Sequence, residues 1–166
     1  KCGIKMTRAE YNQCVDDYAD GVYRFILKNI RDEDKADGIV QDAFVKMWDK
    51  VEAVSFNKAK SYLFTAAYHT MIDCIRKDKR MVGQEESHEN ILTSENDYSD
   101  LNEILHEALD TLPEIQKSVI LLRDYEGYSY EEIGKITGLN ESQVKVYIYR
   151  ARKSLKAYIG SLDRVL

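Results

Sequence analysis

The sequence predicts an all-α fold of two small helical domains joined by an acidic linker, and three observations support this prediction. Apolar residues recur at three- to four-residue steps along almost the whole chain, which is the period of an amphipathic helix. No alternating strand pattern of four or more residues appears outside the loops. The 166 residues are 44% hydrophobic and 32% charged, which is enough apolar material for one domain or two small ones.

Charge is distributed unevenly along the chain and indicates where the linker lies. The net charge is −5, yet residues 81–110 hold nine acidic residues and no Lys or Arg, while the segments on either side each carry a net charge of +2. Met81–Tyr98 is also rich in Glu, Ser and Asn and shows no sustained period. We therefore expect a first domain over residues 1–80, a linker over 81–99 and a second domain over 100–166.

Two helices open the first domain. Thr7 and Glu10 form the pattern of a capping box, so the first helix should begin there and end near Asn29. The second helix should begin near Asp34, where acidic residues meet the positive end of the helix dipole. Its spacing places Trp48 with Ala36, Ile39, Val40, Ala43, Phe44 and Met47 on the inward face and leaves Asp37, Gln41, Asp42 and Lys46 facing outward.

The third helix, from about Lys58 to Arg80, is apolar on two sides. One side consists of Ala59, Tyr62, Leu63, Ala66, Thr70 and Cys74, and the other of Phe64, Tyr68, Met71 and Ile75. A helix with two apolar sides has two partners or a ligand. Its basic end, Arg76–Arg80, fits a solvated helix terminus as well as it fits a binding surface.

Three capping patterns divide the second domain. Thr111–Glu114 has the pattern of a capping box, with Pro in the first turn, and should start a helix that reaches about Tyr125. Ser129–Glu132 should start a short helix that Gly138 closes. Asn140 then caps the last helix of the chain.

The last two helices, separated only by the turn Gly138–Asn140, have helix-turn-helix spacing. Within Asn140–Gly160, five Lys and Arg residues stand against one acidic residue, which is typical of a phosphate-contacting surface. A basic surface helix in an unrelated helical domain is the alternative. A recognition helix reads base edges with its first turns and holds the DNA backbone with basic side chains. We expect base contacts from Ser142, Lys145 and Tyr149, phosphate contacts from Arg150, Arg152, Lys153 and Lys156, and further contacts from Gln143 and Val146.

The sequence predicts no catalytic residue, metal site or cofactor. The three His residues are dispersed, and no nucleophile elbow, glycine-rich phosphate loop or paired metal-ligand motif occurs. Cys2, Cys14 and Cys74 match no zinc spacing, so we expect reduced packing residues. No apolar run is long enough to cross a bilayer, and Lys1–Lys5 lacks the apolar core of a signal peptide. We expect a cytoplasmic protein with no membrane insertion and no small-molecule substrate.

Three segments resemble one family. Asp37–Phe44 resembles region 2.2 of the extracytoplasmic-function (group IV) sigma factors, Tyr62–Lys77 resembles the helix of regions 2.3 and 2.4, and Leu112–Lys153 resembles region 4. Each motif alone is moderately specific, whereas their order and spacing together are highly specific. The chain therefore resembles, over nearly its whole length, a compact two-domain specificity subunit of bacterial RNA polymerase within the sigma-70 family.

This resemblance implies partners and site residues. The second helix would bind core RNA polymerase through Asp37, Gln41, Asp42 and Lys46. The loop Ala53–Lys58 and the third helix would capture and separate the minus-10 promoter DNA, with aromatic stacking and basic contacts to the backbone. The residues implied there are Phe56, Asn57, Lys60, Phe64, Tyr68, His69, Arg76 and Lys77. The second domain would read the minus-35 element, and an anti-sigma factor would control the protein.

Two departures from the family pattern affect the promoter sequence that we expect. Tyr68 and His69 stand where the family commonly has Arg and Asn, and Val146 and Tyr147 stand where Ser and Arg are frequent. The promoter preference therefore cannot be copied from relatives, and Val146 could contact a thymine methyl group. The resemblance also implies a linker inside the polymerase, where Glu85, Glu86, Glu89 and Glu95 would mimic nucleic acid.

Two functions of other classes also fit the residues. One is a free-standing helix-turn-helix regulator, whose first domain senses a ligand or dimerises. The other is a helical protein-interaction module whose basic helix never meets DNA. Dependence on polymerase separates the first from a sigma factor, because a repressor of that class binds a palindrome as a dimer without polymerase.

Overall fold

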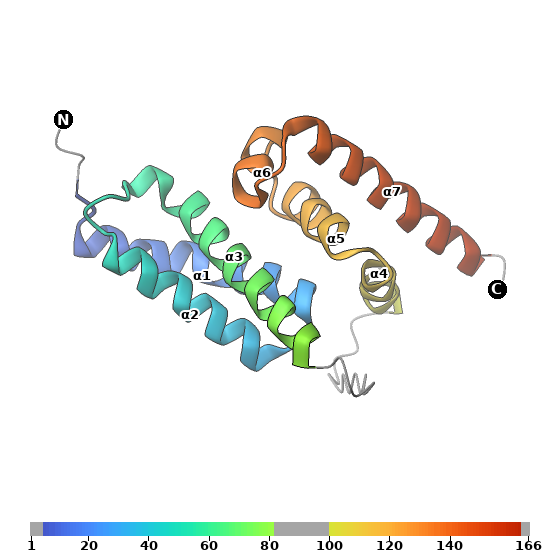
Figure 1. Ribbon diagram of the computed structural model, residues 1–166, viewed down its shortest axis with the longest axis horizontal. Coiled ribbons are helices and arrows are strands. Elements are labelled where there is room, and N and C mark those ends of the chain that lie inside the picture. Colours follow the sequence, from blue (N-terminus) through green and yellow to red (C-terminus); the bar gives the residue numbers. More distant parts are fainter. Residues whose placement is uncertain (1–4, 82–99, 164–166) are drawn as a thin grey trace.

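The computed structural model describes residues 5–81 and 100–163, and these residues contain α-helices, short helical turns and no strand (Figure 1). The all-α prediction is confirmed. The acidic residues Glu85, Glu86, Glu89 and Glu95 and the first cysteine, Cys2, lie outside the described residues. The elements are α1 (Arg8–Ile30), α2 (Glu33–Asp49), the 3₁₀ turn η1 (Phe56–Lys58), α3 (Ala59–Met81), α4 (Asp100–Asp110), α5 (Glu114–Ile120), the π-helical turn η2 (Leu121–Tyr125), α6 (Tyr130–Thr137) and α7 (Glu141–Asp163).

Helices α1, α2 and α3 pack side by side around one core (Figure 1). The capping box predicted at the start of α1 is confirmed, because the Glu10 amide donates to Thr7 Oγ1 at 3.1 Å and the Thr7 amide donates to the Glu10 carboxylate at 3.0 Å. Each helix contributes one inward stripe to this core, which includes Cys14, Val22, Phe25 and Ile26 of α1, Ala36, Ile39, Ala43 and Met47 of α2, and Leu63, Ala67 and Met71 of α3.

A left-handed residue ends α1. Arg31 has φ 53° and is the only residue other than glycine with a positive φ in the described part of the chain. Its amide donates to the Leu27 carbonyl at 2.7 Å, which closes the last turn of the helix. Glycine usually occupies such a position because a Cβ atom is strained there, so Arg31 keeps this conformation at a local cost.

The second half of the chain forms a separate helical group in which α5 and α6 pack against α7 (Figure 1). Two of its predicted caps are confirmed. The Glu132 amide donates to Ser129 Oγ at 3.1 Å, and the Gln143 amide donates to Asn140 Oδ1 at 2.8 Å. The capping box predicted at Thr111 is wrong, because α5 begins at Glu114. A residue that precedes proline disfavours the helical region, so Leu112 cannot join the helix, and Thr111 Oγ1 donates back to the Ala108 carbonyl at 2.6 Å.

The two halves meet along α3. The Phe64 ring, 1% exposed, contacts Tyr128 of the second half edge-on, with 5.4 Å between the ring centroids. Helix α6 also packs against α3. The sequence leaves open whether the second apolar side of α3 has a partner or a ligand. In this structure Phe64 on that side contacts Phe25 of α1 as well as Tyr128 of the second half.

Gly134 and Gly160 lie in helices but differ in the space around them. A Cβ atom at Gly134 would lie 2.7 Å from the Leu139 carbonyl oxygen, whereas at Gly160 nothing lies within 4 Å. We expect Gly134→Ala to lower the free energy of unfolding by about 1–3 kcal/mol, because the α6–α7 turn must move. Gly160→Ala should raise it by about 0.5–1 kcal/mol, because alanine favours the helix. Urea titrations followed by circular dichroism measure both free energies of unfolding. Equal changes in the two variants would contradict the close approach of the Leu139 carbonyl to Gly134.

Candidate nucleic-acid and polymerase interface

Helix α7 presents one buried and one exposed face. Val144, Ile148 and Ala151 are buried against the rest of the second half. On the opposite side, Val146 is 44% and Tyr149 66% exposed, so both side chains are accessible to a partner. The remaining side chains that the sequence assigns to DNA are also exposed, namely Ser142, Gln143, Lys145, Arg150, Arg152 and Lys153.

The turn that precedes α7 fixes the direction of this exposed face. Gly138 ends α6 in the left-handed conformation, with φ 82°, and its amide donates to the Gly134 carbonyl at 2.8 Å. The Gln143 side chain accepts from the Asn140 amide at 3.0 Å, so its predicted contact with DNA competes with a role in the cap. The first turn of α7 is therefore held rigidly while its outer side chains stay accessible.

Charged side chains of α7 fall into two groups. Arg152 donates to Asp124 at 2.7 Å and Lys145 pairs with Glu141 at 3.3 Å. The hydrogen bond to Asp124 raises the pKa of the Arg152 guanidinium. Arg150 and Lys153 form no ion pair within the described residues, which leaves their charge available to an external anion. Sequence reasoning missed the Asp124 contact because that residue precedes Arg152 by 28 positions.

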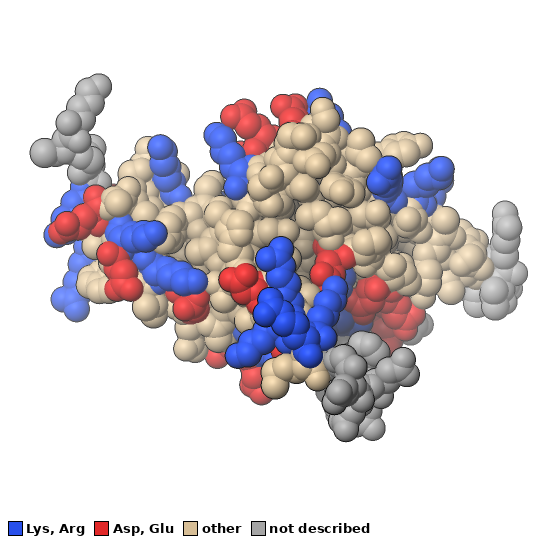
Figure 2. Space-filling model, viewed as in Figure 1, with Lys and Arg blue, Asp and Glu red and all other residues tan. Residues whose placement is uncertain are grey.

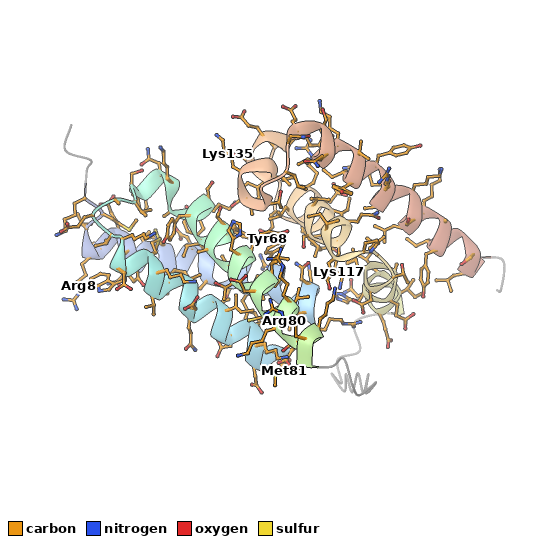
Figure 3. The ribbon with its side chains drawn as sticks, viewed as in Figure 1. Arg8, Tyr68, Arg80, Met81, Lys117 and Lys135 are labelled. Atoms are coloured by element: carbon orange, nitrogen blue, oxygen red, sulfur yellow. The ribbon has the colours of Figure 1, made fainter. Side chains whose placement is uncertain are left out.

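The residues assigned to minus-10 DNA differ in how far they are exposed. Asn57, His69, Arg76 and Lys77 are exposed, and Phe56 and Lys60 are half-buried. Phe64 and Tyr68 are buried, at 1% and 5% exposure, and burial raises the pKa of the Tyr68 hydroxyl. Tyr68 lies where the two halves of the molecule meet (Figure 3). The structure therefore brings these two aromatic side chains to the interdomain surface, where no DNA base can reach them.

Basic side chains gather at the C-terminal end of α3. Arg76, Lys77, Lys79 and Arg80 are all exposed there. Figure 2 shows Lys and Arg side chains clustered over this end of α3, with further basic side chains over α7. Both helices of the predicted DNA contacts thus carry positive charge, although the net charge of the chain is −5.

The outward face of α2 carries the four residues assigned to polymerase. Asp37 and Gln41 are exposed, and the Gln41 amide donates to Asp37 at 3.3 Å. Asp42 and Lys46 instead join α2 to α3, because the Thr70 hydroxyl donates to Asp42 at 3.1 Å and Lys46 donates to that hydroxyl at 3.1 Å. The hydrogen bond from Lys46 lowers the pKa of the Asp42 carboxyl.

Two large apolar side chains lie beside these residues. Val45 is 57% and Trp48 48% exposed, so the inward position predicted for Trp48 is wrong. Trp48 instead rests edge-on against Tyr11, with 5.0 Å between ring centroids. The sequence spacing did indicate the outward position of Trp48. Val45 follows the exposed Gln41 by one helical turn, and Trp48 follows Val45 by nearly another.

Comparison with known proteins places this arrangement in a family. Residues 14–81 match the family model "Sigma-70 region 2" and residues 102–155 match "Sigma-70, region 4". RNA polymerase sigma factor SigV of Bacillus subtilis (strain 168) is 35% identical over 160 residues, which span 95% of each chain. The chain belongs to the extracytoplasmic-function sigma factors of the sigma-70 family. Accordingly, it acts as an RNA polymerase sigma factor in promoter recognition and transcription initiation.

Further relatives agree with this family. The ECF RNA polymerase sigma factor SigM of Bacillus subtilis is 27% identical over 145 residues, covering 84% of this chain and 89% of that protein. The solved structure of the sigma factor RpoE in complex with the anti-sigma factor NepR from Bartonella quintana superposes with a TM-score of 0.80 at 26% identity, covering 91% of this chain and 97% of that one. Within residues 5–81 and 100–163, no helix is long and apolar enough to span a membrane.

Glu126 of this sigma factor lies at the surface where the second half covers α3. Burial raises the pKa of its carboxyl, although Arg24, Lys60 and Lys28 oppose that effect. A carboxyl whose pKa is higher in the folded state binds its proton more tightly there, so its contribution to stability falls as pH rises through and above the usual carboxyl range.

We therefore expect Glu126→Gln to raise the thermal unfolding midpoint at pH 7, and this gain should shrink near pH 4 as the native carboxyl becomes protonated. Thermal melts at both pH values measure the effect, with Glu103→Gln as a control on an exposed carboxyl of α4. A lower midpoint at pH 7 would show that attraction to the three cations outweighs burial.

Proposed function

We propose that this sigma factor uses three surfaces for three contacts. The outward face of α2 binds core RNA polymerase, the η1–α3 segment captures and separates minus-10 DNA, and α7 reads the minus-35 element. In this proposal residues 1–80 and 100–166 form the two functional domains, and residues 81–99 connect them. The observation that best supports the proposal is the capped helix α7, whose exposed face combines basic and aromatic side chains.

For the minus-35 element, we propose that α7 lies in the major groove. Ser142, Lys145 and Tyr149 lie on its first turns, where a recognition helix meets base edges. Val146 is exposed between them and can contact a thymine methyl group. Arg150 and Lys153 serve as phosphate contacts, and Arg152 joins them by exchanging Asp124 for a phosphate.

For the minus-10 element, we propose that Phe56 and Asn57 of η1 line the site for an unpaired base. Lys60, Arg76 and Lys77 follow the backbone with positive charge, and His69 replaces the amide that the family commonly has at this position. Phe64 and Tyr68 supply stacking surfaces once they are uncovered, because single-strand binding combines aromatic stacking with basic contacts.

The broader role follows from these contacts. We propose that the protein is a non-catalytic initiation factor that acts in the cytoplasm, where core polymerase and DNA are found, and needs no cofactor. An anti-sigma factor is a proposed partner, since the similar Bartonella quintana protein was solved in complex with one. A free-standing helix-turn-helix regulator is the competing function, and it would bind DNA without polymerase.

The polymerase contact is tested with the double variant Asp37→Ala/Gln41→Ala. We expect at least about a tenfold loss of affinity for core polymerase with an unchanged melting temperature, because both side chains are exposed. Asn12→Ala/Asp16→Ala on α1 is the matched control, since it also removes an exposed amide and an exposed carboxylate four residues apart. Analytical size exclusion and fluorescence anisotropy measure binding. Wild-type protein that forms no complex with core polymerase would favour the free-standing regulator.

The minus-35 contacts are tested with single variants of α7 in the polymerase complex. Arg150→Ala should weaken promoter binding by a similar factor on all sequences. It should also reduce the slope of log affinity against log salt concentration by about one. Lys145→Ala should change which minus-35 sequences are selected from a promoter library. Arg8→Ala is the control, because Arg8 is exposed at the far end of α1 (Figure 3). Unchanged promoter choice and salt slope in both variants would contradict the role of α7.

A further inference from the structure

The guanidinium of Arg152 on α7 already has an anionic partner in the free protein. Arg152 Nη2 donates to Asp124 Oδ1 at 2.7 Å, and the two side chains are 51% and 43% exposed. The pair therefore lies at the surface, on the helix that carries the proposed minus-35 contacts. An exposed ion pair contributes little to the stability of a fold. Its larger effect is on what Arg152 can bind, because a carboxylate and a phosphate compete for the same donors.

An uncommon turn of the backbone carries Asp124. The Glu126 amide donates to the Leu121 carbonyl, five residues earlier, at 3.1 Å, and this bond closes the π-helical turn η2. Turns of this kind are rare and occur frequently at functional sites. Asp124 lies within η2 and precedes Arg152 by 28 positions, so the fold of the second half brings the two side chains together.

Three basic side chains gather around Tyr130 at the start of α6. The Arg123 guanidinium lies 4.6 Å and the Lys145 ammonium 5.6 Å from the centre of the Tyr130 ring. The hydrogen bond to Asp124, and to a smaller extent Tyr130, raise the pKa of the Arg152 guanidinium. The Asp124 carboxylate is therefore bound beside a concentration of positive charge, which would also attract a DNA phosphate.

The other basic residues assigned to the minus-35 element differ from Arg152. Lys145 pairs at 3.3 Å with Glu141, one turn earlier on the same helix, and its ammonium keeps further N–H groups for a base edge. Arg150 and Lys153 form no ion pair within residues 5–81 and 100–163. Asp124 therefore competes at one of the proposed phosphate contacts of α7 and leaves Arg150 and Lys153 unhindered.

We propose that Asp124 limits the affinity of α7 for DNA by occupying Arg152 in the place of a backbone phosphate. This inference rests on the proposed function, in which Arg152 contacts the promoter backbone. A sigma factor meets a large excess of non-specific duplex, and basic residues supply essentially all of the affinity for such DNA. Asp124 lowers that affinity in the free protein. In the polymerase complex α7 is held next to its element, and the high effective concentration compensates for the weaker contact.

Asp124→Asn tests this role, because it removes the charge and keeps the shape of the side chain. We expect the free full-length variant to bind non-specific duplex about fivefold more tightly, near the upper limit for an exposed ion pair. The slope of log affinity against log salt concentration should become steeper by about one. In the wild type, a cation released from the phosphate is balanced by a cation attracted to the vacated Asp124 carboxylate, and the variant lacks this balance.

Fluorescence anisotropy with a labelled duplex that lacks promoter sequence measures both quantities over a series of salt concentrations. The double variant Asp124→Asn/Arg152→Ala should bind as Arg152→Ala alone does, because the gain acts through the Arg152 guanidinium. Glu103→Gln is the matched control, since it removes one negative charge from an exposed carboxylate of α4 in the same half. It should leave the affinity and the salt slope at the wild-type values.

The outcomes separate this inference from the proposed function. Weaker or unchanged binding of Asp124→Asn would overturn the inference, since Asp124 would then only position Arg152. A gain that Glu103→Gln reproduces, or that persists in the Arg152→Ala background, would also overturn it, because net charge alone would explain such a gain. If the wild-type chain forms no complex with core polymerase, the proposed function fails, and the measurements on the free chain still decide whether Asp124 competes with a phosphate.

Discussion

The burial of α3 on two sides is the constraint on which the rest of the structure depends. Leu63 and Met71 of this helix are fully buried. Phe64 lies between Phe25 of α1 and Tyr128 of the second half, with 5.7 and 5.4 Å between the ring centroids. A helix that is apolar on both sides cannot leave one of them in water without cost. The interdomain contact and the proposed minus-10 surface therefore share a single element.

Short-range rules explain the helix-turn-helix almost completely. Reciprocal hydrogen bonds between Ser129 and Glu132, and between Asn140 and Gln143, begin the two helices at the residues that the sequence predicts. Gly138 supplies the left-handed turn, and Gly134 leaves room for the Leu139 carbonyl. Because each device acts within a few residues, the orientation of α7 is encoded locally.

Contacts between distant segments are where sequence reasoning fails. Periodicity predicts that Phe64 is buried, but it does not show whether a helix, a ligand or a base covers its side chain. The position of Trp48 was predicted wrongly because this residue lies at the boundary between the inward and outward faces of α2. Its contact with the Tyr11 ring then decides which face its side chain joins. Thr111 has the right spacing for a cap, yet the proline two residues later overrides it. Only the cover of Phe64 depends on distant neighbours that local pattern cannot specify, whereas Trp48 and Thr111 each had a local signal in the sequence.

A cluster of polar side chains also joins the two halves of the molecule, and it consists of Asn29, Arg31, Asp110, Lys117 and Ser118. Attraction between buried charges largely offsets the cost of removing them from water, so such a cluster adds specificity rather than much net stability. Lys117 and Asp110 both belong to the second half, so the halves are joined by the bonds of Lys117 and Ser118 to Asn29 and by the pair of Arg31 with Asp110. Together with the contact of Phe64 and Tyr128, these bonds define one arrangement of the two halves.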